Sequence, residues 1–224
     1  MPISFNINDT EKEENAFPEN AGRVRSGMVA NGRPMSLDSW RFTLTNKEIA
    51  EKVAAKFGGT PETWDNVKEP WELLTDGLTE LDITINSPKA ISANMVLWGR
   101  KAIIRECSGV VQNDGKPCVC PSDTFERKQA GKDGTGCEPS LFAAFTIDGL
   151  EELGSFVYRS GAWTAAEDWS KAEEKVAEID GPVKAKLITE LVEFTTKAGE
   201  DRRFRKPVLR VLGPADTEPK NEPF

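Results

Sequence analysis

Alternating and helically spaced apolar residues divide this chain into short strands and amphipathic helices. Residues 81–85 alternate strictly between apolar and polar side chains, which predicts a half-buried strand. Further apolar segments that predict strands are residues 40–44, 102–105, 141–147 and 155–158. Residues 187–195 and 204–212 flank a polar turn and predict a β-hairpin, although residues 185–195 are also compatible with a helix.

Two segments instead carry apolar residues at spacings of three and four. Thr45 and Glu48 form a capping-box pattern with Thr45 as the N-cap, and a Gly-Gly pair ends the helix that follows. Thr164 and Glu167 repeat the pattern and open a charged helix from residue 165 to about 179. Its apolar face either packs on the protein body or docks a partner helix.

The mixture of elements predicts an α+β fold, with a strand-rich single globular body and about two main helices. Residues 1–20 are polar and predict a flexible N-terminal arm, whereas residues 214–224 contain three prolines and predict a disordered tail. The globular domain is then residues 21–213. Within it, residues 105–140 are rich in glycine and proline, and we expect a loop-rich insertion there.

Composition narrows the classes of function. The 224 residues contain 37 acidic and 29 basic side chains, for a net charge of −8, which disfavours charge-driven binding of nucleic acid. The absence of histidine excludes Ser-His-Asp and Cys-His catalysis and histidine metal ligands. No apolar run approaches the roughly 18 residues of a membrane span, and the acidic start differs from a signal peptide. We therefore expect a cytosolic protein.

All four cysteines lie between positions 107 and 137, and two of them form the sequence Pro117-Cys118-Val119-Cys120-Pro121. A residue before proline is extended, and side chains two apart in an extended chain point to the same side. Tetrahedral zinc with bonds of about 2.3 Å needs sulfurs roughly 3.8 Å apart, a gap that two such side chains can close.

We therefore expect a structural Zn²⁺ bound by Cys107, Cys118, Cys120 and Cys137. A site with four thiolates is coordinatively closed, so its role would be structural rather than catalytic. Two alternatives stay open. The cysteines can be free buried thiols, or they can form two disulfides in one of three pairings.

No other motif predicts chemistry. The carboxylates between residues 65 and 82 have the pattern of a solvated surface, so we assign no catalytic residue. Residues 202–206 (Arg-Arg-Phe-Arg-Lys) are compatible with phosphate contacts and stacking by Phe204. A solvated hairpin strand with Phe204 facing the core is the favoured interpretation, because the whole chain is acidic.

Several segments together resemble the recombination directionality factors of actinobacterial phages, over roughly residues 20–212. The segments are Gly22 to Arg25, Leu37 to Thr43, Phe57 to Gly59 with Trp64, Leu97-Trp98, Arg105 to Gly109, Pro117 to Pro121, Gly136 to Pro139, Gly161 to Ala166 and Arg203 to Leu209. The Cys-x-Cys between prolines and the Trp-x-Ala-Ala segment are the more specific parts. One departure is Glu106-Cys107-Ser108-Gly109, where the family pattern is Arg-Cys-Asp-Gly.

The resemblance implies a binding protein rather than an enzyme. Such factors bind a large serine integrase near its coiled-coil region and switch it from joining attP with attB to joining attL with attR. They would touch DNA only indirectly through the integrase complex, involve no membrane, and act in the cytoplasm of the bacterial host cell. The sequence identifies no partner-binding residues. Two other classes stay open: a zinc-stabilised phage DNA-binding or regulatory protein, and a small carboxylate enzyme.

Overall fold

The structure is a computed structural model that describes residues 20–30, 32–196 and 199–215. The predicted N-terminal arm lies outside the described residues except for Asn20. The predicted C-terminal tail likewise lies outside them, except for Pro214 and Ala215.

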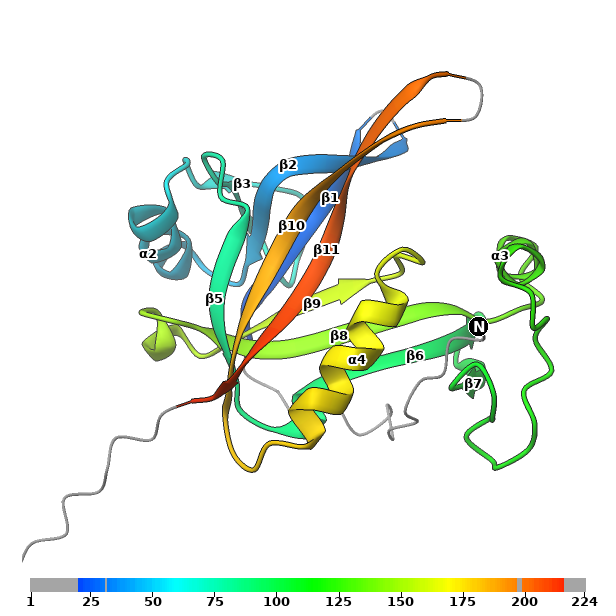
Figure 1. The fold of residues 1–224 in the computed structure, drawn as a ribbon. Helices are drawn as coiled ribbons and strands as arrows, with labels where there is room; N and C mark the ends of the chain where they lie inside the picture. Colours follow the sequence, from blue (N-terminus) through cyan, green and yellow to red (C-terminus); the bar gives the residue numbers. More distant parts are fainter. Residues whose placement is uncertain (1–19, 31, 197–198, 216–224) are drawn as a thin grey trace, which may run out of the picture.

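Eleven strands form one sheet in the described part of the chain (Figure 1). They are β1 (Asn20–Ala30), β2 (Arg33–Leu44), β3 (Glu62–Thr63), β4 (Trp71–Leu74), β5 (Glu80–Ile85), β6 (Ile91–Trp98), β7 (Ile103–Cys107), β8 (Glu138–Ile147), β9 (Ser155–Ser160), β10 (Val183–Thr195) and β11 (Asp201–Pro214). The order is β11-β10-β5-β8-β9-β1-β2-β4-β3, with β6 between β8 and β7. Among the described strand pairs β1–β9 is parallel and the others are antiparallel.

The sheet branches at β8. One edge of β8 pairs with β9, while the other pairs with β6 and then, at its end, with β5 through Ile147 and Ile83. Because β5 and β6 share one edge of the same strand, the two branches must turn away from each other. Figure 1 shows β5, β10 and β11 crossing the direction of β8 and β6. The predicted hairpin of β10 and β11 is confirmed, and the helical alternative for residues 185–195 is wrong.

Three α-helices lie in the described residues: α2 (Lys47–Phe57), α3 (Thr124–Lys132) and α4 (Ala166–Ala177). Two 3-10 turns, η2 (Pro88–Ala90) and η3 (Glu151–Leu153), complete the elements. Helices α2 and α4 confirm the two predicted helices. Helix α3 lies inside the cysteine region and was not predicted there. Its N-cap is Asp123, whose Oδ1 accepts the N–H groups of Phe125 and Glu126.

Both predicted capping boxes are wrong in detail. The N-cap of α2 is Asn46, whose Oδ1 accepts the Ile49 N–H at 3.0 Å. Thr45 instead donates its hydroxyl to the carbonyl oxygen of Ala21 in β1. At α4 the N-cap position is Ala165, and no side chain caps the helix. The first turn of α4 is therefore stabilised by packing, since Ala165 and Ala166 are both fully buried.

A column of aromatic side chains joins the sheet to α4. Trp40 of β2 meets the edge of Tyr158 in β9 at a centroid distance of 5.6 Å, and Tyr158 stacks on Trp169 of α4 at 5.5 Å. All three rings are fully buried. The face of α4 that contains Trp169, Ala172 and Val176 therefore packs on the protein body, which excludes it as a docking face for a partner helix.

Candidate functional site

The cysteine module, which we define as residues 105–140, is held by β6. This strand pairs with both β7 and β8, so that Met95 lies opposite Cys107 on one side and Pro139 on the other. Cys107 ends β7 and Cys137 directly precedes β8. The sheet register therefore brings together two cysteines that are thirty positions apart, and the intervening chain supplies the other two.

Three of the four predicted ligands form a tight cluster. The Sγ atoms of Cys107, Cys120 and Cys137 lie within 4.8 Å of one another, and all three residues are buried. The Sγ of Cys118 lies 3.5 Å from that of Cys107 but is not part of the mutually close group. None of the four cysteines forms a disulfide in the structure. Three buried cysteines thus lie close enough to bind a metal ion.

The sulfurs accept hydrogen bonds from the surrounding chain. The backbone N–H of Cys120 donates to the Sγ of Cys118, and that of Cys137 donates to the Sγ of Cys120, each at 3.4 Å. The guanidinium of Arg105 donates to Cys137 Sγ at 3.4 Å and to Cys120 Sγ at 3.5 Å. Donors of this kind stabilise the thiolate form, which is the form that binds metal.

The pKa values of these thiols are displaced in opposite directions. The hydrogen bond from Cys107 lowers the pKa of Cys137 to about 6, and Arg105 also favours its thiolate. The same hydrogen bond, together with burial, raises the pKa of Cys107. Burial raises the pKa of Cys120. Without a metal, the hydrogen bond from Cys107 and the Arg105 guanidinium thus favour ionisation of Cys137 over that of Cys107.

Buried polar groups order the rest of the module. Arg127 of α3 donates to the carbonyl oxygens of Pro121 (2.7 Å) and Gly109 (3.0 Å). Ser108 accepts the N–H groups of Val110 and Val111 with its hydroxyl oxygen and so fixes the turn after Cys107.

A second polar cluster lies on β1 and β2. The carboxylate of buried Glu69 pairs with Arg23 at 2.7 Å and Arg25 at 3.2 Å, and accepts the Thr43 hydroxyl at 2.5 Å. The Trp64 ring lies 4.6 Å from the guanidinium of Arg41. Residues from three of the segments that carry the family resemblance meet here: 22–25, 37–43 and Trp64. The interpretation of Glu69 as a solvated surface carboxylate is wrong, since its side chain is 6% exposed.

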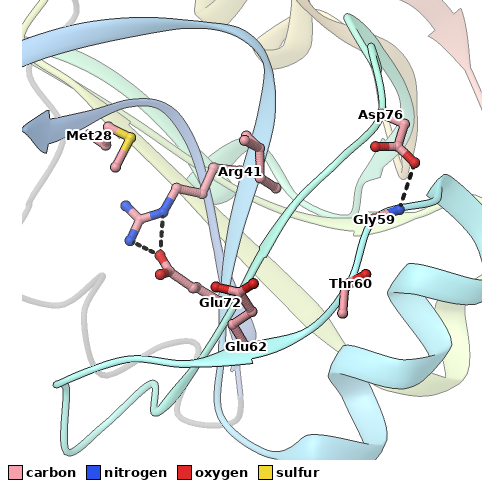
Figure 2. Close-up of a pocket in the computed structure, with 8 residues that line it drawn as sticks. Met28, Arg41, Gly59, Thr60, Glu62, Glu72 and Asp76 are labelled. Carbon is pink, nitrogen blue, oxygen red and sulfur yellow. Dashed lines mark hydrogen bonds and ion pairs between the residues drawn. The ribbon is translucent and has the colours of Figure 1, made fainter.

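A pocket of about 420 Å³ lies beside this cluster (Figure 2). It is lined by Met28, Arg41, Gly59, Thr60, Glu62, Glu72, Leu74 and Asp76. Arg41 donates to Glu72 through Nε at 2.8 Å, and Asp76 accepts the Gly59 N–H at 3.1 Å. Gly59 has φ +88°, and a Cβ atom there would lie 2.2 Å from the carbonyl oxygen of Leu74. This close approach requires glycine and shapes the pocket wall.

The basic segment 202–206 lies on β11 in the predicted hairpin. Arg202 pairs with Glu200 at 2.5 Å, Arg205 with Asp38 at 3.4 Å, and Lys206 with Asp168. The expectation that Phe204 faces the core is wrong. Its ring instead packs against Phe194 of β10, with centroids 6.2 Å apart.

Comparison with known proteins identifies the family of this chain. Residues 21–212, most of the chain, match a family described as "Gp3-like: Recombination directionality factor-like". No solved structure matches the chain. In the described part of the chain, every helix is too short or too polar to cross a membrane. The chain belongs to the Gp3-like family of recombination directionality factor-like proteins, which indicates a non-catalytic regulatory protein that acts with a recombinase.

Proposed function

We propose that this protein binds a large serine integrase near its coiled-coil region and switches it from integration to excision. Integration joins attP with attB, and excision joins attL with attR. The observation that carries the proposal is the family match over residues 21–212. The net charge of −8 and the paired cations of the segment 202–206 favour a protein partner, so that DNA is reached only through the integrase.

Such a switch requires differential affinity. The factor must bind the integrase–DNA arrangement that leads to excision more tightly than the one that leads to integration. About 5.5 kcal/mol over the synaptic complex would convert a hundredfold preference for one direction into a hundredfold preference for the other. A binding protein can supply this energy without any catalytic group of its own.

We also infer that Cys107, Cys118, Cys120 and Cys137 bind a structural Zn²⁺. Four thiolates match the preferred tetrahedral ligand set of zinc, which then cross-links the chain at a closed site. The 3.5 Å separation of the Cys107 and Cys118 sulfurs is close to the roughly 3.8 Å that such a site needs. Arg105 would offset the negative charge of the thiolates, and the N–H groups of Cys120 and Cys137 would orient the sulfurs.

Recombination in vitro tests the main proposal. The integrase encoded in the same genome is assayed on attL with attR, and on attP with attB, with and without this protein. We expect the first reaction to start and the second to be suppressed. If folded, metal-loaded protein changes neither reaction, the directionality proposal is wrong, and binding of bare DNA is the next property to measure.

Native mass spectrometry tests the metal proposal separately. The wild-type protein should retain one zinc, and Cys120→Ser should lose it, because Cys120 lies within the tight sulfur cluster. Cys118→Ser is the informative comparison, since Cys118 lies outside that cluster. Weaker zinc binding by Cys118→Ser supports four ligands, whereas unchanged binding reduces the site to three cysteines. Metal-free wild-type protein with reduced thiols would contradict the proposal altogether.

A further inference from the structure

The hairpin of β10 and β11 extends beyond the rest of the sheet. The two strands pair as far as Thr195 and Asp201, but β5 supports β10 only from Val183 to Ile188. Residues 190–195 and 201–206 therefore form a free two-stranded ribbon, which projects from the body in Figure 1. We call this segment the ribbon. An isolated two-stranded ribbon is only marginally stable, so something else must hold it.

Two ion pairs brace the ribbon from opposite faces. Arg205 pairs with Asp38 of β2 at 3.4 Å and donates to the carbonyl oxygen of Thr189 at 3.0 Å. Lys206, whose side chain points the other way, pairs with Asp168 of α4. These contacts favour one direction of the ribbon before any partner binds. Such preorganisation lowers the entropic cost of association.

One face of the ribbon is apolar and incompletely covered. The register places Val192 opposite Phe204 and Phe194 opposite Arg202, so these four side chains share a face. The Phe194 and Phe204 rings meet at 78°, yet Phe194 remains 48% exposed. Aromatic side chains with one neighbouring arginine are typical of the anchors of protein interfaces.

We propose that this ribbon face is the docking surface for the recombinase, an inference that rests on the proposed function. The complementary surface presents aliphatic side chains flanked by carboxylates. The aliphatic groups would cover Val192, Phe194 and Phe204, while the carboxylates would meet Arg202. The carboxylate that pairs with Arg202 in the structure belongs to exposed Glu200.

The ribbon is less suited to duplex DNA. Three of its four cations already pair with carboxylates, which limits the number of phosphates that they can neutralise. Packing of Phe194 or Phe204 against duplex DNA would also require base pairs to be unstacked, which costs free energy. The exposed side chains of this ribbon face are mainly apolar. A protein partner can bury them in an apolar interface, which is favourable.

Binding to the purified integrase from the same genome tests the proposal. The double variant Phe194→Ala/Phe204→Ala should weaken the Kd about tenfold or more. The control is Phe125→Ala, which removes a 77% exposed ring from the cysteine module and should leave the Kd nearly unchanged. Both variants should unfold cooperatively near the wild-type temperature, since neither changes the buried core.

Charge reversal gives a second readout. Arg202→Glu should slow association with the integrase at low salt, and the difference should shrink as salt is raised. Arg210→Glu is the matched control, because Arg210 is exposed on the same strand outside the ribbon. Its association rate should stay closer to that of the wild type.

Three results would overturn the ribbon proposal. The first is weaker integrase binding by Phe125→Ala than by the double Phe variant. The second is lost binding of bare duplex DNA by Arg202→Glu with integrase binding intact. The third is that the wild type forms a dimer, and that the double Phe variant abolishes this dimer but leaves integrase binding unchanged. If the wild type itself does not bind the integrase, the proposed function is wrong. That result is obtained with the wild type alone and is therefore distinct from a failure of the ribbon proposal.

Discussion

At the residue scale, the single tyrosine of the chain occupies a central position. Tyr158 lies between Trp40 and Trp169 and its hydroxyl is 3.1 Å from the Ser26 hydroxyl. Its ring thereby connects β9, β2 and α4, and its hydroxyl reaches Ser26 of β1. Each member of this column is enclosed by others, so a substitution there leaves a cavity that the neighbours cannot fill.

Trp169→Ala should therefore destabilise the fold by about 3–5 kcal/mol, the usual cost of removing a fully buried large ring. It also loses the indole hydrogen bond to the carbonyl oxygen of Pro207 in β11. Trp98→Ala is the control, because Trp98 is 60% exposed and its loss should cost about 0.5 kcal/mol or less. Urea unfolding at equilibrium measures both values, and equal costs would contradict the central role of the column.

The burial of Tyr158 also predicts how the stability of the fold depends on alkaline pH. Burial raises the pKa of its phenol above the ordinary value of 10.0, so the folded state favours the neutral form. This contribution to stability is complete below pH 10 and is lost as the pH rises above it, because the unfolded tyrosine then ionises first. Ultraviolet absorbance should show less tyrosinate near pH 10 in the folded protein than in denaturant, where the tyrosine titrates at its ordinary pKa. Equal titration in both states would contradict this prediction.

At the scale of elements, the two main helices begin in different ways. The side chain of Asn46 caps α2, whereas α4 begins with buried alanines and no side-chain cap. Asn46→Ala should cost about 0.5–2 kcal/mol, and exposed Thr164→Ala should cost clearly less. Thermal and urea unfolding of the two variants provide the comparison. A larger loss of stability from Thr164→Ala than from Asn46→Ala would show that Thr164 caps α4 after all.

The same elements show what the sequence can predict. Strand β5 has one covered face, so alternation marks it, and the polar turn between two apolar segments marks the hairpin of β10 and β11. Strand β6 is buried on both faces over its first six residues, and polar Ser92 and Asn94 interrupt the apolar run that such burial would suggest. Helix α3 is polar and lies in a region rich in glycine, so its periodic signal is weak.

The cysteine cluster and the cluster around Glu69 also differ in how far the sequence predicts them. The four cysteines are one residue type within one short region, and that pattern is visible without a structure. Glu69 meets Arg25 across 44 positions and Thr43 across 26, and all three residues are of common types. Only the pairing of β1 with β2 and the path of the loop from α2 bring them together. One sequence alone does not specify such contacts.

At the scale of the whole molecule, the cysteine module lies at one end of the sheet, where its three buried cysteines join the hydrophobic core. The module is connected to the sheet through the ends of β6, β7 and β8. The aromatic column and β5 lie in other parts of the sheet. Removing the proposed zinc with a chelator should accelerate amide exchange in residues 107–137. The amides of β5 and β10 should stay protected, because their hydrogen bonds do not depend on the module. Uniform loss of protection would show instead that the metal stabilises the entire fold.

The order of strands has a consequence for synthesis on the ribosome. Strand β1 needs β9 as its parallel neighbour, and β5 needs β10, which begins only at Val183. Contacts between such distant segments form slowly, and strand edges that wait for partners are prone to aggregate. Nearly the whole chain must therefore leave the ribosome before the sheet can close. A truncated message that ends before β10 would yield a chain with the edge of β5 exposed, rather than a weaker version of the regulator.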